Sequence, residues 1–163
     1  MMAANRWWRM PHLSFFKPAE NRHSARPFAA GRTAAREQAN RKRGMQGLHV
    51  LVVEDEALIA LLMEDWLREA GIDVVGPCAT VAEALKATRE NPVSAATLDF
   101  RLSGETTEVL ADTLARLGVP FIFCSGEPIP HSLLKKWPDS VLVTKPTTSA
   151  CVVQALAEAT QLK

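Results

Sequence analysis

Five short apolar runs alternate with five helix-like segments after residue 47, and this alternation constrains the fold more than any other feature. The pattern predicts strands over residues 48–53, 73–76, 94–100, 120–124 and 141–144, and helices over residues 56–70, 80–90, 105–117, 132–136 and 149–161. Strict alternation of strand and helix favours one parallel sheet with helices on both faces. We therefore expect an α/β, doubly wound parallel sheet, formed by one domain over residues 48–163.

Local signals refine two of the helices and one loop. The first helix has apolar residues at helical spacing, which we expect to form its core face: Ile59, Leu62, Met63, Trp66 and Ala70. Thr80 is a predicted N-cap, with Glu83 three residues later as in a capping box. Residues 101–104 are expected to form a loop before the third helix.

Residues 1–47 differ sharply in charge from the rest of the chain. They contain ten Lys or Arg and two acids, a net charge of +8, whereas residues 48–163 carry −7. Prolines interrupt the segment and no helix or strand period is sustained, so we expect a basic, mostly disordered extension. An inert or mis-assigned extension, with Met45 as the true start, is favoured over an electrostatic arm for nucleic acid or anionic membrane.

Cysteine usage and hydropathy exclude several classes of protein. Cys78, Cys124 and Cys151 form no C-x-x-C pair, which argues against a zinc site or a disulfide framework and favours a reducing cytoplasm. No apolar run approaches the ~20 residues of a membrane helix, and no secretory signal is evident. Because no helix-turn-helix is evident, we expect no direct DNA binding by the folded domain.

Polar residues follow four of the predicted strands. Glu54 and Asp55 follow the first strand, Asp99 ends the third, Ser125 follows the fourth and Lys145 follows the fifth. In doubly wound sheets, ligands bind at the carboxyl ends of the strands. We therefore expect three carboxylates, a hydroxyl and an ammonium group to converge on one small volume.

This set of groups suits phosphoryl transfer. Clustered carboxylates need a cation, and oxygen ligands favour Mg²⁺ over zinc. Asp99 could bind the metal with one oxygen and attack phosphorus with the other, while Lys145 stabilises the phosphoryl oxygens and Ser125 donates a hydrogen bond. Each residue also has a plainer possible role. Asp99 could cap a helix or lie in solvent, and Glu54 and Asp55 could stabilise the N-terminus of the helix that follows them. Ser125 could form an ordinary Ser-Gly turn, and Lys145 could be a solvated lysine.

Taken together and in this order, these motifs resemble the receiver domain of two-component response regulators. The matching residues are Glu54, Asp55, Asp99, Ser125-Gly126 and Lys145-Pro146. The resemblance implies a flavodoxin-like (βα)5 sheet of order 2-1-3-4-5 and a phosphoacceptor signalling domain rather than a metabolic enzyme. It further implies that a histidine kinase or a histidine phosphotransfer protein is the phosphoryl donor. The resemblance also implies that the carbonyl of Arg101 is a further metal ligand, and that the peptide before Pro146 is cis.

The run from Phe121 to Gly126 further resembles the FAT GUY subgroup of stand-alone receivers, from which the chain also departs. It contains no tyrosine, Thr147 follows Lys145-Pro146, and Leu142 holds the usual aromatic position. If the domain switches, residues 127–137 are the expected reporter, and Trp137 is expected to cover the core. The alternative is a pseudo-receiver that binds proteins without phosphorylation. In either case we expect output through an unidentified downstream protein, and pairing into a homodimer is possible for such a domain.

Overall fold

The computed structural model describes residues 44–161, so most of the predicted basic extension lies outside the described residues. The strands are β1 (His49–Val53), β2 (Asp73–Cys78), β3 (Ala95–Leu98), β4 (Arg101–Leu102), β5 (Glu105–Thr106), β6 (Phe121–Ser125) and β7 (Val141–Thr144). The helices of at least four residues are α2 (Ala57–Glu69), α3 (Val81–Glu90), α4 (Glu108–Leu117), α5 (His131–Leu134) and α6 (Ser149–Gln161).

The main sheet confirms the predicted fold class. Its strands lie in the order β2-β1-β3-β6-β7, and every adjacent pair is parallel. Numbered within this sheet alone, the order is 2-1-3-4-5, as in flavodoxin-like folds. The central strands β3 and β6 are buried along their whole length, because helices cover both faces of the sheet.

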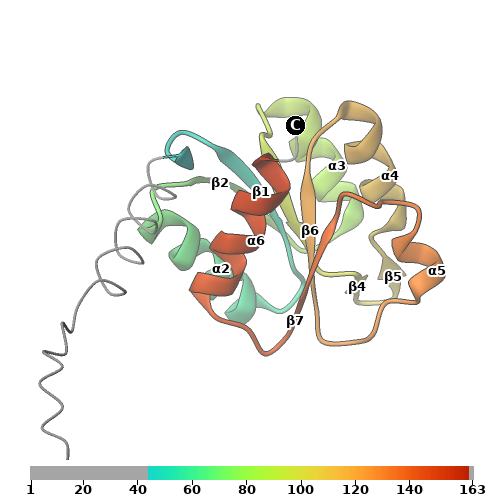
Figure 1. The fold of residues 1–163 in the computed structure, drawn as a ribbon. Helices are drawn as coiled ribbons and strands as arrows, with labels where there is room; N and C mark the ends of the chain where they lie inside the picture. Colours follow the sequence, from blue (N-terminus) through green and yellow to red (C-terminus); the bar gives the residue numbers. More distant parts are fainter. Residues whose placement is uncertain (1–43, 162–163) are drawn as a thin grey trace, which may run out of the picture.

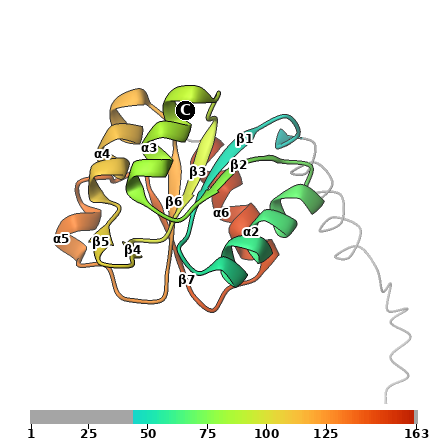
Figure 2. The same cartoon turned by 180° about the vertical axis from the view of Figure 1, so that it is seen from behind.

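Two separate cores lie on the two faces of this sheet. Figures 1 and 2 show α2 and α6 against one face and α3 and α4 against the other. Met45 is only 2% exposed and packs into the core on the α2 and α6 side, although it precedes the first predicted strand. On the opposite side, Trp137 is 5% exposed and contacts the rings of Phe121 and Phe123, which confirms its predicted role as a core cover.

The predicted core face of α2 was partly wrong. Met63 is buried as expected, but Leu62 is 46% exposed, and Ala60 and Leu67 are buried instead. Leucines occur on several sides of this helix, so the helical period alone did not determine which side meets the sheet. Leu58 is also on the exposed side.

Strand β2 extends two residues beyond its predicted end at Gly76, through Pro77 to Cys78. The pairing register with β1 shifts there, and Gly76 has a φ of +98°. A Cβ at this position would lie 2.9 Å from the backbone nitrogen of Cys78, so only glycine fits without displacement.

Residues 101–106 form a small antiparallel hairpin, where a loop and the start of a helix were predicted. Strands β4 and β5 pair through Arg101 with Thr106 and Leu102 with Glu105, and α4 begins only at Glu108. The Glu105 carboxylate accepts a hydrogen bond from the backbone nitrogen of Val81 at 3.1 Å. This contact holds the hairpin against the N-terminus of α3 and explains why Glu105 does not begin a helix.

Among residues 44–161, each helix is too short or too polar to cross a bilayer.

Candidate functional site

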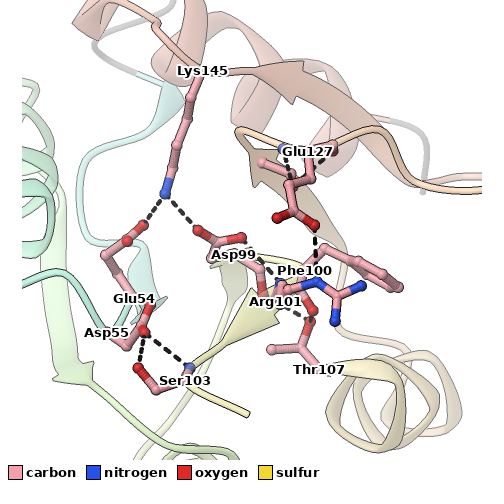
Figure 3. A network of polar contacts seen from close by, with 10 residues as sticks. Glu54, Asp55, Asp99, Phe100, Arg101, Ser103, Thr107, Glu127 and Lys145 are labelled. Carbon is pink, nitrogen blue, oxygen red and sulfur yellow. Dashed lines mark hydrogen bonds and ion pairs between the residues drawn. The ribbon is translucent and has the colours of Figure 1, made fainter. Parts of the chain in front are cut away.

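The structure brings four of the predicted site residues to one edge of the sheet. Glu54 directly follows β1, Asp99 directly follows β3 and Lys145 directly follows β7. Figure 3 shows the side chains of these three residues pointing toward one another, with Asp55 beside them. The backbone fixes this geometry, because the Asp99 nitrogen donates to the Val53 carbonyl at 2.9 Å. The predicted convergence of three carboxylates and one ammonium group is therefore present.

Lys145 joins two of the carboxylates directly. Its Nζ atom lies 2.6 Å from Glu54 Oε2 and 2.6 Å from Asp99 Oδ2. The three side chains are 13%, 2% and 12% exposed for Lys145, Glu54 and Asp99, so water screens these ion pairs weakly. The backbone nitrogen of Lys145 donates to the Ser125 carbonyl, and the Lys145–Pro146 peptide is cis, as the resemblance implies.

Burial and charge shift the protonation of this group of residues. Burial raises the pKa of the Glu54 carboxyl above its ordinary value of 4.5, and the Asp99 charge adds to this, while Lys145 opposes both. Burial alone would lower the pKa of the Lys145 ammonium, but hydrogen bonds to Asp99 and Glu54 outweigh it and raise that pKa. Lys145 therefore stays charged at neutral pH, and the site holds more negative than positive charge.

The three carboxylates fit a divalent cation. Glu54, Asp55 and Asp99 each offer one oxygen within 4.8 Å of the others. The Glu54 Oε1 atom is buried and has no hydrogen-bond partner among the described residues. An unpartnered buried carboxylate oxygen is costly, and a hard cation such as Mg²⁺ would satisfy it.

Ser103 orients the third carboxylate of the set. Its backbone nitrogen and its hydroxyl both donate to Asp55 Oδ2, at 2.9 and 2.5 Å. The hydrogen bond from the Ser103 side chain lowers the pKa of Asp55. Asp55 therefore stays ionised and fixed in direction, as a metal ligand must be. Ser103 was not among the predicted site residues, because only the turn between β4 and β5 brings it to Asp55.

Ser125 lies at the site but is engaged in its own turn. Its hydroxyl donates to the Glu127 carbonyl at 3.0 Å and accepts from the Glu127 nitrogen at 3.2 Å. In this conformation Ser125 therefore has the plainer of its two expected roles, which is to form a turn. A hydrogen bond from Ser125 to a phosphoryl group stays a prediction, as does metal binding by the Arg101 carbonyl.

Thr107 is a buried residue of the site that sequence reasoning missed. Its side chain is fully buried, and its hydroxyl donates to the Asp99 carbonyl at 2.9 Å. This bond ties the backbone of Asp99 to the start of α4. No sequence signal could have identified it, because the partner is a backbone carbonyl eight residues away.

A second missed contact links the start of β4 to the segment that follows β6. Arg101 Nε donates to Glu127 Oε2 at 2.9 Å, linking the segment after Asp99 to the segment after Ser125. Leu142, at the position expected for an aromatic residue, is 40% exposed. An ion pair between Arg101 and Glu127 therefore lies near Asp99, and Leu142 on β7 is partly exposed.

Several solved structures are similar to this chain. SdrG from Sphingomonas melonis Fr1 is 34% identical, over 69% of this chain and 95% of that one, with a TM-score of 0.60. The receiver domain of the PhyR response regulator from Erythrobacter litoralis is 27% identical, over 74% of this chain and 95% of that one, with a TM-score of 0.60. The response regulator PhyR from Brucella abortus is 26% identical over 81% of this chain, which covers 55% of that protein, with a TM-score of 0.66. No family model and no curated protein matches the chain.

Proposed function

The chain belongs to the family of response-regulator receiver domains, and from this premise we propose that it accepts a phosphoryl group on Asp99. The proposed donor is a histidine kinase or a histidine phosphotransfer protein. The observation that carries the proposal is the position of Lys145 Nζ, 2.6 Å from Asp99 Oδ2, beside three carboxylates that can share a cation. An ammonium group and a metal site beside one carboxylate can together supply the positive charge that stabilises a phosphoryl group in transfer to it.

The proposed reaction forms one bond and breaks another. An Asp99 carboxylate oxygen bonds to phosphorus as the P–N bond of the donor phosphohistidine breaks, and the donor imidazole retains the electron pair. Lys145 then shifts its hydrogen bond from Asp99 to a phosphoryl oxygen and stabilises the charge there. Ser125 would donate to another phosphoryl oxygen after its hydroxyl leaves the Glu127 carbonyl. Water then attacks phosphorus with the help of the same residues, the bond between phosphorus and the Asp99 oxygen breaks, and inorganic phosphate and the free Asp99 carboxylate are released.

Glu54, Asp55 and one oxygen of Asp99 would hold Mg²⁺ in this proposal, with the Arg101 carbonyl as the predicted fourth ligand from the protein. When bound, the ion supplies positive charge that offsets repulsion between the carboxylates and the incoming phosphoryl group. The buried Oε1 of Glu54 would gain its missing partner.

The consequences of phosphorylation would pass through protein partners. We propose a cytoplasmic signalling role with an unidentified downstream protein as target, and pairing with a second copy is part of the proposal. Membership of the FAT GUY subgroup stays a prediction.

Incubation with acetyl phosphate and Mg²⁺, followed by intact mass spectrometry, tests the phosphoacceptor. We expect wild type to gain the mass of one phosphoryl group and Asp99→Asn to gain none. Asp73→Asn removes an exposed aspartate at the opposite end of the sheet, and this control should label like wild type. No adduct on wild type, or an equal adduct on Asp99→Asn, would contradict the proposal.

The second candidate function is a pseudo-receiver that binds proteins without being phosphorylated. Two observations favour it: Leu142 replaces the usual aromatic residue, and the Ser125 hydroxyl is bonded within its own turn. The labelling experiment separates the two functions, because a pseudo-receiver would show no Asp99-dependent adduct.

A further inference from the structure

The ion pair between Arg101 and Glu127 joins the first residue of β4 to the segment after β6, beside the proposed phosphoacceptor. Arg101 lies two residues after Asp99, and its backbone nitrogen donates to Asp99 Oδ1 at 3.1 Å. Its side chain extends to Glu127 Oε2, two residues after Ser125. Figure 3 shows the Arg101 and Glu127 side chains meeting beside the Asp99 carboxylate. The backbone of Arg101 is thus bonded to the acceptor side chain, while its guanidinium group is bonded to an acid from the segment after β6.

This ion pair is built from exposed groups. The side chains of Arg101 and Glu127 are 58% and 65% exposed, so water screens their attraction. Exposed pairs of this kind contribute little to stability. A stronger anion within reach of the guanidinium would therefore displace Glu127 at small cost.

A phosphoryl group on Asp99 is such an anion. It carries about −1.5 to −2 charges and three acceptor oxygens, whereas the Glu127 carboxylate carries a single charge. The planar fork of a guanidinium group matches phosphoryl oxygens and can bind two of them at once. Lys145 is shared between Asp99 and Glu54, so a guanidinium group would add to the positive charge that Lys145 and a bound cation offer the phosphoryl oxygens.

We propose that Arg101 is a phosphoryl-binding residue of this site, and that Glu127 holds it only while Asp99 is unmodified. The proposal rests on the phosphoacceptor function assigned above to Asp99. When Asp99 is phosphorylated, the guanidinium group exchanges Glu127 for phosphoryl oxygens.

The exchange also gives the domain a way to report its state without the usual aromatic residue. Glu127 is held by its side chain through Arg101 and by its backbone through the Ser125 hydroxyl. If the Arg101 guanidinium turns to the phosphoryl group and the Ser125 side chain rotates toward it, these three hydrogen bonds of Glu127 are lost. The segment that follows, up to α5, then loses its attachment to the site and stays held by the buried side chain of Ile129, so its exposed surface changes for a partner protein.

The test uses beryllium fluoride, which forms an acyl-phosphate-like adduct on aspartate, with the full chain in Mg²⁺. Its dissociation constant is measured by ¹⁹F NMR for wild type, Arg101→Gln, Glu127→Gln and the double variant. We expect Arg101→Gln to weaken binding by about tenfold, because a charge-assisted bidentate contact is lost. Glu127→Gln should tighten binding about threefold when Arg101 is present, because the competing exposed pair is removed.

The double variant separates competition for Arg101 from simple repulsion by Glu127. If Glu127 acts by occupying Arg101, Glu127→Gln should have a smaller effect in the Arg101→Gln background. An equal effect in both backgrounds, or wild-type affinity in Arg101→Gln, would overturn the proposal. Lys86→Gln and Glu90→Gln are matched controls, because they remove the same charges from a similarly exposed pair on α3.

A second readout follows the released segment directly. Hydrogen exchange at the Glu127 amide should accelerate when wild type forms the adduct, because Ser125 no longer accepts from that nitrogen. Unchanged exchange would contradict the release of Glu127. An absence of any adduct on wild type would instead overturn the phosphoacceptor function, so the two failures are distinguishable.

Discussion

At the scale of single residues, the acidic site is a compromise between stability and chemistry. Glu54 is 3% exposed and leaves one carboxylate oxygen without a partner among the described residues. Lys145 offsets part of this cost, but one ammonium group faces three carboxylates. The excess negative charge prepares the site for a cation and destabilises the domain when no cation is bound.

The raised pKa of Glu54 predicts how stability depends on pH. In the folded state Glu54 binds its proton more tightly than in the unfolded chain, so its effect on stability is most favourable below the ordinary pKa of 4.5. The stabilising contribution is lost as pH rises through the raised folded-state pKa. We expect Glu54→Gln to reduce this loss, in urea unfolding measured between acidic and neutral pH without divalent ions. Glu69→Gln controls for the loss of one exposed charge, and identical pH profiles for wild type and Glu54→Gln would contradict the account.

At the scale of elements, side chains at helix and strand ends attach the loops to the sheet. Thr80 caps α3 by accepting from the Glu83 nitrogen at 3.2 Å, and the Glu83 carboxylate accepts from the Ala79 nitrogen at 2.9 Å. Glu105 adds a third bond at the same helix end, from the neighbouring hairpin. The N-terminus of α3 is therefore well satisfied, and the hairpin that carries Ser103 is held in place.

The cap of α3 makes a direct stability prediction. We expect Thr80→Ala to lower the free energy of unfolding by about 1 kcal/mol, because the Glu83 nitrogen loses its acceptor. Thr80→Ser retains the hydroxyl and should lose much less. Urea unfolding of both variants is the measurement, and equal losses for the two would show that the cap does not stabilise the helix.

The local sequence pattern was sufficient to predict the order of strands and helices and the edge of the sheet at which the site lies. The capping pair Thr80 and Glu83 and the positions of Asp99 and Lys145 could be predicted, since they depend on neighbours in sequence or on the parallel sheet. The contact of Glu105 with α3 could not be predicted, because its partner, the Val81 nitrogen, is 24 residues away in the sequence. The pair between Arg101 and Glu127 likewise joins β4 to the segment after β6, whose relative position only the tertiary structure defines.

At the scale of the whole molecule, two hydrophobic cores lie on opposite faces of one sheet, under the helices that Figures 1 and 2 show on those faces. The site lies at the edge of this sheet where β1, β3 and β7 end. Trp137 closes one of these cores after α5. Its ring packs against Phe121 and Phe123, and its Nε1 donates to Asp112 Oδ1 at 3.0 Å. The same residue thus connects β6, α4 and the segment leading to β7.

Replacement of Trp137 should therefore affect global stability. We expect Trp137→Ala to lower the free energy of unfolding by about 3–5 kcal/mol, through loss of buried ring contacts. Trp137→Phe keeps much of the packing and loses the hydrogen bond to Asp112, so a smaller loss of about 1 kcal/mol is expected. Chemical unfolding measures both, and a loss below 1 kcal/mol for the alanine variant would show that Trp137 does not close the core.

The central claim is that three carboxylates bind a divalent ion beside a phosphoryl-accepting Asp99. The most direct measurement is the rate of acetyl phosphate labelling as a function of Mg²⁺ concentration, for wild type and Asp55→Asn. We predict saturable dependence on Mg²⁺, no labelling in EDTA, and at least about a tenfold higher Mg²⁺ requirement for Asp55→Asn. Labelling that proceeds equally in EDTA, or an unchanged Mg²⁺ requirement in Asp55→Asn, would contradict the account.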